Sequence, residues 1–342
     1  MPRWCFLLVL AAAAAACSDR SRPAPAAGSA SEATAVAPRA APAFSVDDAI
    51  RLFEAVAACR LEPHGLDHMC PARNALDRAY ATDIDPQGLR YDTIEAAARA
   101  VVAHASPSVR VRAFDQLASD RDEALIVRTL LAERDPMALR AMIFVAPTLV
   151  EHHPAVVDAV LGHITHPVPE VRLAVLRALA TEYNVAHRGL FEAIALRASD
   201  DPDELVRAHA CLGLGLLQEP RAVAVFHRML VATTPPAVFD ACGAGLVHAW
   251  LADPEREHPV DAAYPRTLAL LRKGPHRRGA PGVATIEAIQ GLVRGHRTFD
   301  DLPPWVDVAD ARDALAAFVA SPGADPVARR LAAEVVVELE PT

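Results

Sequence analysis

Residues 106–110 read Ser-Pro-Ser-Val-Arg, a helix start that returns in altered form four more times along the chain. The other copies are Asp135-Pro136 to Arg140, His166-Pro167 to Arg172, Asp201-Pro202 to Arg207 and Asp325-Pro326 to Arg329. The first four arginines stand 30, 32 and 35 residues apart, and an apolar, Ala-rich run follows each copy. Self-similarity at such a period is typical of stacked helix pairs. We therefore expect an all-α fold that presents a long surface, which favours binding over catalysis.

Each copy of this phrase contains the residues that a helix start needs. Proline in the first turn loses no hydrogen bond, and the Ser, Asp or His before it can cap free backbone N–H groups. The apolar residue that follows enters the core, while the arginine can lie across to the next repeat. Apolar periodicity predicts one helix that starts at each of the first four copies and further helices between the copies. The predicted ranges are residues 94–105, 107–118, 121–134, 137–150, 155–164, 168–182, 188–198, 203–217 and 220–231.

Pro107, Val109, Arg110 and Ala113 carry the pattern in the first copy, and equivalent residues carry it in the others. This pattern resembles HEAT repeats, in particular the short kind called PBS-lyase-like, over residues 91–342. The resemblance implies a right-handed α-solenoid of stacked antiparallel helix pairs, HEAT-like or armadillo-like, with about six to seven repeats. The lyase label belongs to relatives that act on bilin-carrying proteins, and no residue here carries that activity over.

The N-terminal segment has the composition of an export signal. Trp4 to Ala16 is an apolar run of 13 residues that follows a single positive charge at Arg3. A permanent membrane span needs roughly 20 helical residues, so this run is too short to be one. We expect residues 1–16 to be a signal peptide.

The junction Ala14-Ala15-Ala16-Cys17 resembles the lipobox of bacterial lipoproteins, in which the cysteine is lipidated and becomes the mature N-terminus. Residues 17–43 would then be the lipidated Cys17 and a disordered Ala/Pro/Ser tether. Because Ser18 follows the cysteine, the resemblance implies an outer-membrane anchor that faces the periplasm. The alternative is a secreted or periplasmic protein, since the ordinary signal peptidase also accepts small residues.

Residues 44–90 are expected to form a helical hairpin that caps the array. Its connection holds Cys59, His64, His68 and Cys70, the ligand types and number of a closed zinc site. In an oxidising compartment, however, two cysteines that flank a short connection normally pair. We expect a Cys59–Cys70 disulfide, and the zinc site and free thiols are the alternatives.

Cys211 and Cys242 stand at matching Ala-Cys positions one repeat apart. Stacked helices lie about 8–10 Å apart, which is beyond the reach of a disulfide. We therefore expect two buried free thiols, although an offset in register would let them pair. Glycines 213, 215, 243 and 245 fall inside the same helices, where small residues let neighbouring repeats approach.

The formal net charge of −9 disfavours a nucleic-acid partner, because an acidic chain repels phosphate backbones. Prolines and glycines break the repeat over residues 252–281 and leave only a short helix over 266–272. This insertion ends in the chain's one basic cluster, a candidate contact for an anion, a lipid headgroup or an acidic partner. The alternative is a solvated loop beside a helix C-terminus. The cluster comprises Arg272, Lys273, His276, Arg277 and Arg278.

The sequence contains no GxSxG, Walker or HExxH motif and indicates no cofactor. We expect a non-catalytic, membrane-tethered scaffold that binds a protein partner in the bacterial cell envelope. The alternative is an accessory or catalytic subunit with a metal or ligand pocket. That pocket would lie at the Cys59–Cys70 connection or at His152, His153, His163 and His166.

Overall fold

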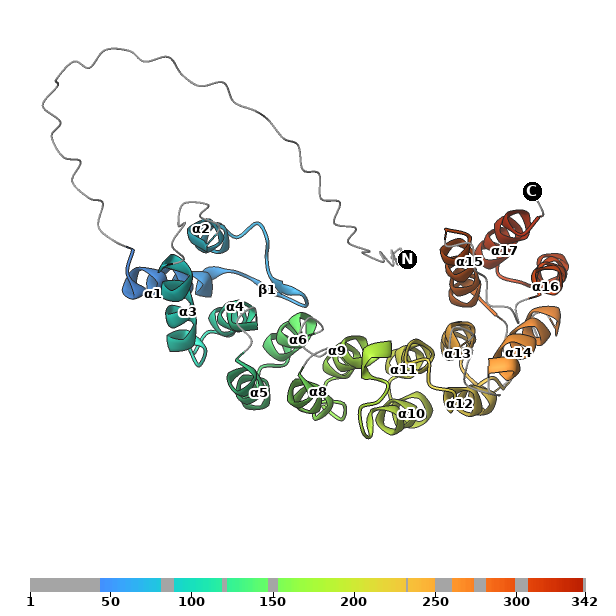
Figure 1. Cartoon of the computed structure of the whole chain (residues 1–342), viewed down its shortest axis with the longest axis horizontal. Coiled ribbons are helices and arrows are strands. Elements are labelled where there is room, and N and C mark those ends of the chain that lie inside the picture. Colours follow the sequence, from blue (N-terminus) through green and yellow to red (C-terminus); the bar gives the residue numbers. More distant parts are fainter. Residues whose placement is uncertain are drawn as a thin grey trace, which may run out of the picture. The chain divides into compact units, whose positions relative to one another are not determined.

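A computed structural model describes residues 44–80, 89–118, 122–146, 153–231, 233–249, 260–273, 281–298 and 307–340. In these ranges the chain forms sixteen α-helices, two 3₁₀ turns and one two-stranded antiparallel hairpin (Figure 1). Several sequence predictions lie outside the described residues. They concern residues 1–43 with Cys17, and His152, His276, Arg277 and Arg278.

The N-terminal part begins with helix α1 (Val46–Ala55), whose first turn is closed by a capping box. Ser45 Oγ accepts a hydrogen bond from the Asp48 N–H at 3.2 Å, and the Asp48 carboxylate accepts the Ser45 N–H at 2.9 Å. The remaining elements are the 3₁₀ turn η1 (Val56–Ala58), strands β1 (Leu61–Glu62) and β2 (Gly65–Leu66), and helices α2 (Pro71–Tyr80) and α3 (Leu89–Val101).

The helices that follow alternate between two rows. The first, the α4 row, comprises α4 (Pro107–Ala118), α6 (Pro136–Val145), α9 (Pro169–Leu179), α11 (Glu204–Leu216), α13 (Pro236–His248), α15 (Val283–Thr298) and α17 (Pro326–Glu338). The second, the α5 row, comprises α5 (Glu123–Ala132), α8 (Pro154–Leu161), α10 (Leu190–Asp200), α12 (Ala222–Met229), α14 (Val260–Lys273) and α16 (Val308–Ala320). Each helix of the α4 row contacts the next member of that row (Figure 1). The helices are thus packed in sequential pairs, and their apolar faces form a continuous core.

The repeated arginines connect neighbouring pairs. Arg110 donates two hydrogen bonds of 2.8 Å to Glu133, which directly follows α5, and Arg172 binds Asp201, which directly follows α10, in the same way at 2.7 and 2.9 Å. Both also donate to carbonyl oxygens just before their own helices. Asp201 opens the next copy of the repeated phrase, so the predicted reach across to the next repeat is confirmed at Arg172. Arg110 reaches the end of α5, two residues before the next copy. Arg207 donates only to carbonyl groups of its own loop.

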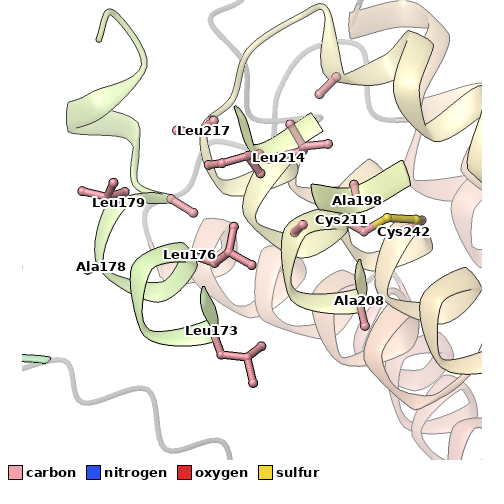
Figure 2. Close-up of a cluster of buried hydrophobic side chains, with 14 of the residues drawn as sticks. Leu173, Leu176, Ala178, Leu179, Ala198, Ala208, Cys211, Leu214, Leu217 and Cys242 are labelled. Carbon is pink, nitrogen blue, oxygen red and sulfur yellow. A yellow bond between two sulfur atoms is a disulfide. The ribbon is translucent and has the colours of Figure 1, made fainter. Parts of the chain in front are cut away.

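The prediction of free thiols at Cys211 and Cys242 is wrong, because a disulfide joins them with their Cα atoms 4.7 Å apart (Figure 2). The expected spacing of about 8–10 Å does not hold between α11 and α13. A Cβ atom on Gly215 would lie 2.2 Å from the Gly245 carbonyl oxygen, and one on Gly245 would lie 2.5 Å from that of Cys211. The glycines therefore let two backbones meet, and this contact brings both sulfurs within bonding range.

The expected break in the repeat over residues 252–281 is also corrected in part. Helix α14 spans Val260–Lys273 rather than residues 266–272, and it packs against α13 and α16 as a member of the α5 row. Its side chains Leu268 and Leu271 are fully buried. The burial of this face outweighs the local helix-breaking residues.

Helix α15 begins with a cap that comes from another helix. The Asp240 carboxylate on α13 accepts the N–H groups of Gly282, Ala284 and Thr285 at 2.7–3.0 Å, together with the Thr285 hydroxyl at 2.7 Å. Asp240 thus combines the role of an N-cap with that of a link between two repeats.

Replacing Asp240 with Ala should lower the free energy of unfolding by about 2 kcal/mol, because it leaves several N–H groups without an acceptor. The matched control is Asp325→Ala, which removes an ordinary cap within α17 and should cost about 1 kcal/mol. Urea denaturation of both variants measures the difference. Equal losses would show that the link between α13 and α15 adds nothing.

Candidate functional site

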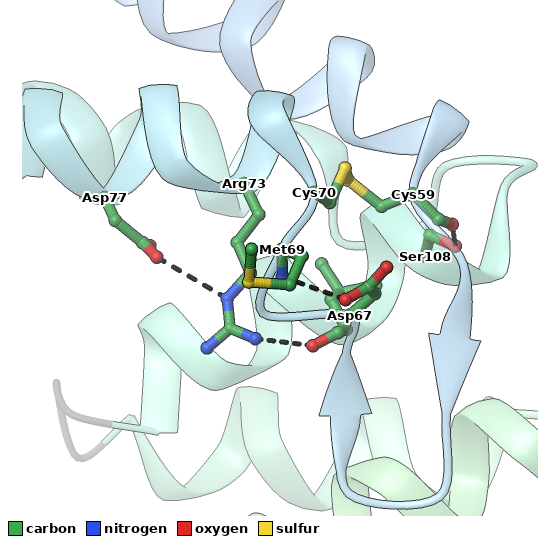
Figure 3. The surroundings of a disulfide bond; sticks show 8 residues. Cys59, Asp67, Met69, Cys70, Arg73, Asp77 and Ser108 are labelled. Atoms are coloured by element: carbon green, nitrogen blue, oxygen red, sulfur yellow. Dashed lines mark hydrogen bonds and ion pairs between the residues drawn. A yellow bond between two sulfur atoms is a disulfide. The ribbon is translucent and has the colours of Figure 1, made fainter.

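A disulfide and several hydrogen bonds hold the β1–β2 hairpin in place (Figure 3). Cys59 and Cys70 are joined with their Cα atoms 5.6 Å apart, at the two ends of the hairpin segment. Ser108 Oγ on α4 donates to the Cys59 carbonyl oxygen at 3.0 Å, and Arg73 on α2 donates to that of Leu66. The hairpin is therefore fixed to α2 and α4.

Because both sulfurs form this bond, the alternative zinc site at Cys59, His64, His68 and Cys70 loses two of its four ligands. Over the described ranges, no group of three or more His, Cys, Asp or Glu side chains is placed to hold a metal ion. His163 contacts the Leu130 carbonyl oxygen at 3.2 Å, and its ring centre lies 6.4 Å from that of His166. His153 contacts Glu123 at 3.4 Å.

The hairpin forms one wall of an open pocket whose other walls are α6 and α9. Both strands contact α6, and the ring of His64 at the hairpin turn lies 4.5 Å from that of Phe144. The pocket has a volume of about 220 Å³. Its lining comprises Pro63, His64, Arg140, Ile143, Phe144, Glu170, Leu173, Ala174, Arg177 and Ala178.

Arg140 lines this pocket because it stands one residue further along its helix than Arg110 and Arg172 do along theirs. Arg110 and Arg172 are the fourth residues of their helices, whereas Arg140 is the fifth residue of α6. One residue turns a side chain by about 100° around an α-helix. Arg140 therefore does not fold back over its own loop, and it makes no hydrogen bond or ion pair with the described residues of the chain.

Arg177 supplies the second positive charge of the pocket. Its Nη2 atom lies 2.9 Å from Nε2 of His209 on α11, and it forms no ion pair with a described carboxylate. Glu170 also lines the pocket, but it forms no ion pair with either arginine. The pocket thus holds two guanidinium groups that no carboxylate of the described ranges contacts as an ion pair.

The surroundings of the pocket lower the pKa values of Arg177 and His64. Burial lowers the pKa of Arg177, and the positive charge of Arg140 lowers it further. Burial also lowers the pKa of His64, with further lowering by Arg140 and Arg177 and an opposing effect of Glu62. His64 is therefore neutral at pH 7, while the arginines remain charged. A bound anion would offset the repulsion between the two guanidinium groups.

The apolar part of the pocket lies beside these charges. Phe144 is 53% exposed although it is large and apolar, and Leu173 and Ala174 of α9 contribute further carbon surface. An exposed aromatic ring lies beside two arginines that form no ion pair with the described carboxylates. This combination suits a ligand that has both an anionic and an apolar group.

The basic cluster that the sequence singles out is described only in part. Arg272 forms an ion pair with Asp310 of α16, so its charge is already matched. Lys273 is the last residue of α14.

The pocket was not predicted from the sequence, because the sequence analysis expected a helical hairpin over residues 44–90 and not the β1–β2 hairpin that forms one wall. The available signal was the position of Arg140, four residues after its helix-start proline rather than three as in the first copy.

Replacing both Cys59 and Cys70 with Ser should loosen the hairpin without unfolding the helical rows, since the bond closes a short local loop. We expect faster amide hydrogen exchange at residues 61–66, measured by mass spectrometry. The control removes the other disulfide, with Cys211→Ser and Cys242→Ser, and should leave exchange at these residues unchanged. Unchanged exchange in the first variant would mean that Ser108 and Arg73 suffice to hold the hairpin.

The two disulfides indicate an oxidising, extracytoplasmic location. Among the described helices, none has the length and apolar character needed to cross a bilayer. Comparison with models of known families, with curated proteins and with solved structures gives no match.

Proposed function

We propose that the chain is a non-catalytic scaffold that binds a protein partner in the bacterial cell envelope. In this proposal the helix pairs form a right-handed, HEAT-like α-solenoid, and lipidated Cys17 anchors it to the outer membrane on the periplasmic side. The sequential pairing of helices supports the repeat architecture, and the two disulfides support a location outside the cytoplasm. Attachment to the membrane would raise the local concentration of the scaffold near a membrane-bound partner.

The observation that carries the binding function is the pocket between the hairpin, α6 and α9. Arg140 and Arg177 line it and form no ion pair with the described carboxylates, while Arg110 and Arg172, the counterparts of Arg140 in other copies, bind Glu133 and Asp201. Arg140 is half-buried and Arg177 is exposed. Two cations that line one pocket and form no ion pair with the described carboxylates favour an external anionic group. Phe144 and Leu173 add the apolar surface that is typical of a binding site.

The same pocket favours a second candidate, an accessory subunit that binds a small ligand. Its volume of about 220 Å³ is enough for a small molecule, and His64 places a neutral imidazole at its edge. A small ligand and a protein partner are distinguished by what copurifies with the chain.

Affinity capture from cross-linked, detergent-solubilised membranes tests the proposal. The full chain is compared with Cys17→Ala and with the pocket variant Arg140→Glu, Arg177→Glu. The matched control is Arg128→Glu, Arg188→Glu, which makes the same charge change at exposed positions outside the pocket. We expect a discrete protein that the full chain and the control retain and the pocket variant loses.

The Cys17→Ala variant has an intact pocket. If it nevertheless captures no protein, the result would support the membrane tether as well. If no protein is captured in any form, the scaffold proposal is wrong, and native mass spectrometry for a copurifying small ligand tests the second candidate. Capture that is equal in the control and pocket variants would place the binding surface elsewhere.

A further inference from the structure

The pocket also indicates which part of a partner it recognises, an inference that rests on the proposed function. The pocket has a volume of about 220 Å³ and is lined by short stretches of the hairpin, α6 and α9. A pocket of this extent suits a side chain or a chain end, and the rest of a partner would lie outside it.

The charges of the pocket favour a carboxylate over a phosphate. Arg140 and Arg177 supply two positive charges, and Glu170 on the same lining supplies one negative charge. The balance of one positive charge matches a monoanion, whereas a phosphate group carries close to two negative charges at neutral pH. Guanidinium groups are also well suited to the planar geometry of a carboxylate.

The apolar lining adds a requirement for carbon surface on the same residue. Ile143 and Phe144 of α6 and Leu173 and Ala174 of α9 lie around the arginines. An Asp or Glu side chain brings a carboxylate but little apolar surface. The last residue of a peptide brings both, because its α-carboxylate and its side chain are attached to the same carbon atom.

We propose that the pocket binds the C-terminal residue of a peptide partner, with the α-carboxylate held by Arg140 and Arg177 and an apolar side chain packed against Phe144 and Leu173. His64 at the hairpin turn covers one side of the pocket, so the Cys59–Cys70 disulfide positions part of the site. The partner then extends away from the pocket along its own chain, which leaves its N-terminal part outside.

Fluorescence anisotropy with labelled peptides tests this proposal. The probes are Gly-Ser-Gly-X peptides with X as Ala, Leu or Phe, each as the free acid and as the C-terminal amide. We expect the Leu and Phe acids to bind at least tenfold more tightly than their amides. The double variant Arg140→Ala, Arg177→Ala should abolish this preference, whereas Arg188→Ala should keep it.

Further variants separate the two parts of the site. Phe144→Ala should reduce the preference for Leu and Phe over Ala while it retains the preference for acid over amide. Circular dichroism and thermal unfolding verify that each variant is folded. The Arg177→Lys variant keeps the positive charge and should retain part of the preference for acid over amide. It tests the role of the charge even if the double variant Arg140→Ala, Arg177→Ala is less stable.

Several results would overturn the proposal. Equal binding of acids and amides, or no binding by any acid, rules out recognition of a C-terminal carboxylate. Equally tight binding of an amidated peptide with an internal Glu would assign the site to an acidic side chain, and equally tight binding of 3-phenylpropionate would assign it to free small acids. Displacement of the Phe acid by an equal concentration of inorganic phosphate would indicate a general anion site. Any of these results combined with pocket-dependent capture of a protein would leave the proposed function standing.

Discussion

Replacing Asp201 with Ala should lower the free energy of unfolding by about 3–5 kcal/mol, the cost of removing one partner from a buried ion pair. The Asp201 carboxylate has no exposed surface and accepts bonds of 2.7 and 2.9 Å from Arg172 and one of 3.3 Å from Arg197. It also accepts the Asp203 N–H at 3.0 Å. Without it, the buried Arg172 guanidinium keeps its charge but loses its carboxylate partner, and the carbonyl oxygens of His166 and Pro167 remain as acceptors.

Asp203→Ala is the matched control, since it removes a carboxylate two residues away. The Asp203 side chain only caps α11 by accepting the Val206 N–H at 3.0 Å, and its loss should cost about 1 kcal/mol. Urea denaturation of both variants gives the comparison. A loss below about 1 kcal/mol in Asp201→Ala would show that the link between repeats does not stabilise the fold.

The same ion pair predicts how stability depends on pH. Burial raises the pKa of Asp201, but the hydrogen bonds from Arg172 and from the Asp203 N–H outweigh burial, and the net pKa lies below the ordinary value. A carboxyl group with a lowered pKa stabilises the fold above its unfolded pKa of about 4, and this stabilisation is lost as the pH falls through the folded pKa. The loss of stability below about pH 4 should therefore be smaller in Asp201→Asn than in the natural chain.

Replacing Gly215 with Val should cost about 4 kcal/mol, above the usual 1–3 kcal/mol for an overpacked core. A Cβ atom at this position would lie 2.2 Å from the Gly245 carbonyl oxygen and 2.5 Å from the Gly245 Cα atom. Both are backbone atoms, so no side-chain rotation can relieve the overlap. The variant must separate α11 from α13, and this separation also opposes the Cys211–Cys242 disulfide.

Gly291→Ala is the control for this prediction, because it adds a methyl group to a helical glycine in open space. No atom lies within 4 Å of a Cβ built at Gly291 on α15. Alanine in a helix interior is favoured over glycine by about 0.5–1 kcal/mol, so this variant should be slightly more stable. Thermal unfolding measures both. A Gly215→Val variant as stable as the natural chain would mean that the two helices need not touch.

The sequence by itself determined where the helices of the repeated phrase begin, to within one residue or two, and that the helices are packed in pairs. Helix α4 occupies the predicted residues 107–118. These features depend on hydrogen bonds and caps between residues close in the chain, so local residue types are enough to specify them. Helix α6 ends at Val145, before the expected residue 150, ahead of Pro147 in the sequence.

Only the tertiary structure decided the pairing of Cys211 with Cys242 and the formation of the pocket. The disulfide depends on how closely α11 approaches α13, and the pocket depends on where the β1–β2 hairpin lies against α6. The glycines and the shifted Arg140 are visible in the sequence, but distances between helices are not. They arise from the packing of whole side-chain surfaces, where a change of a few ångströms separates a bond from two free thiols.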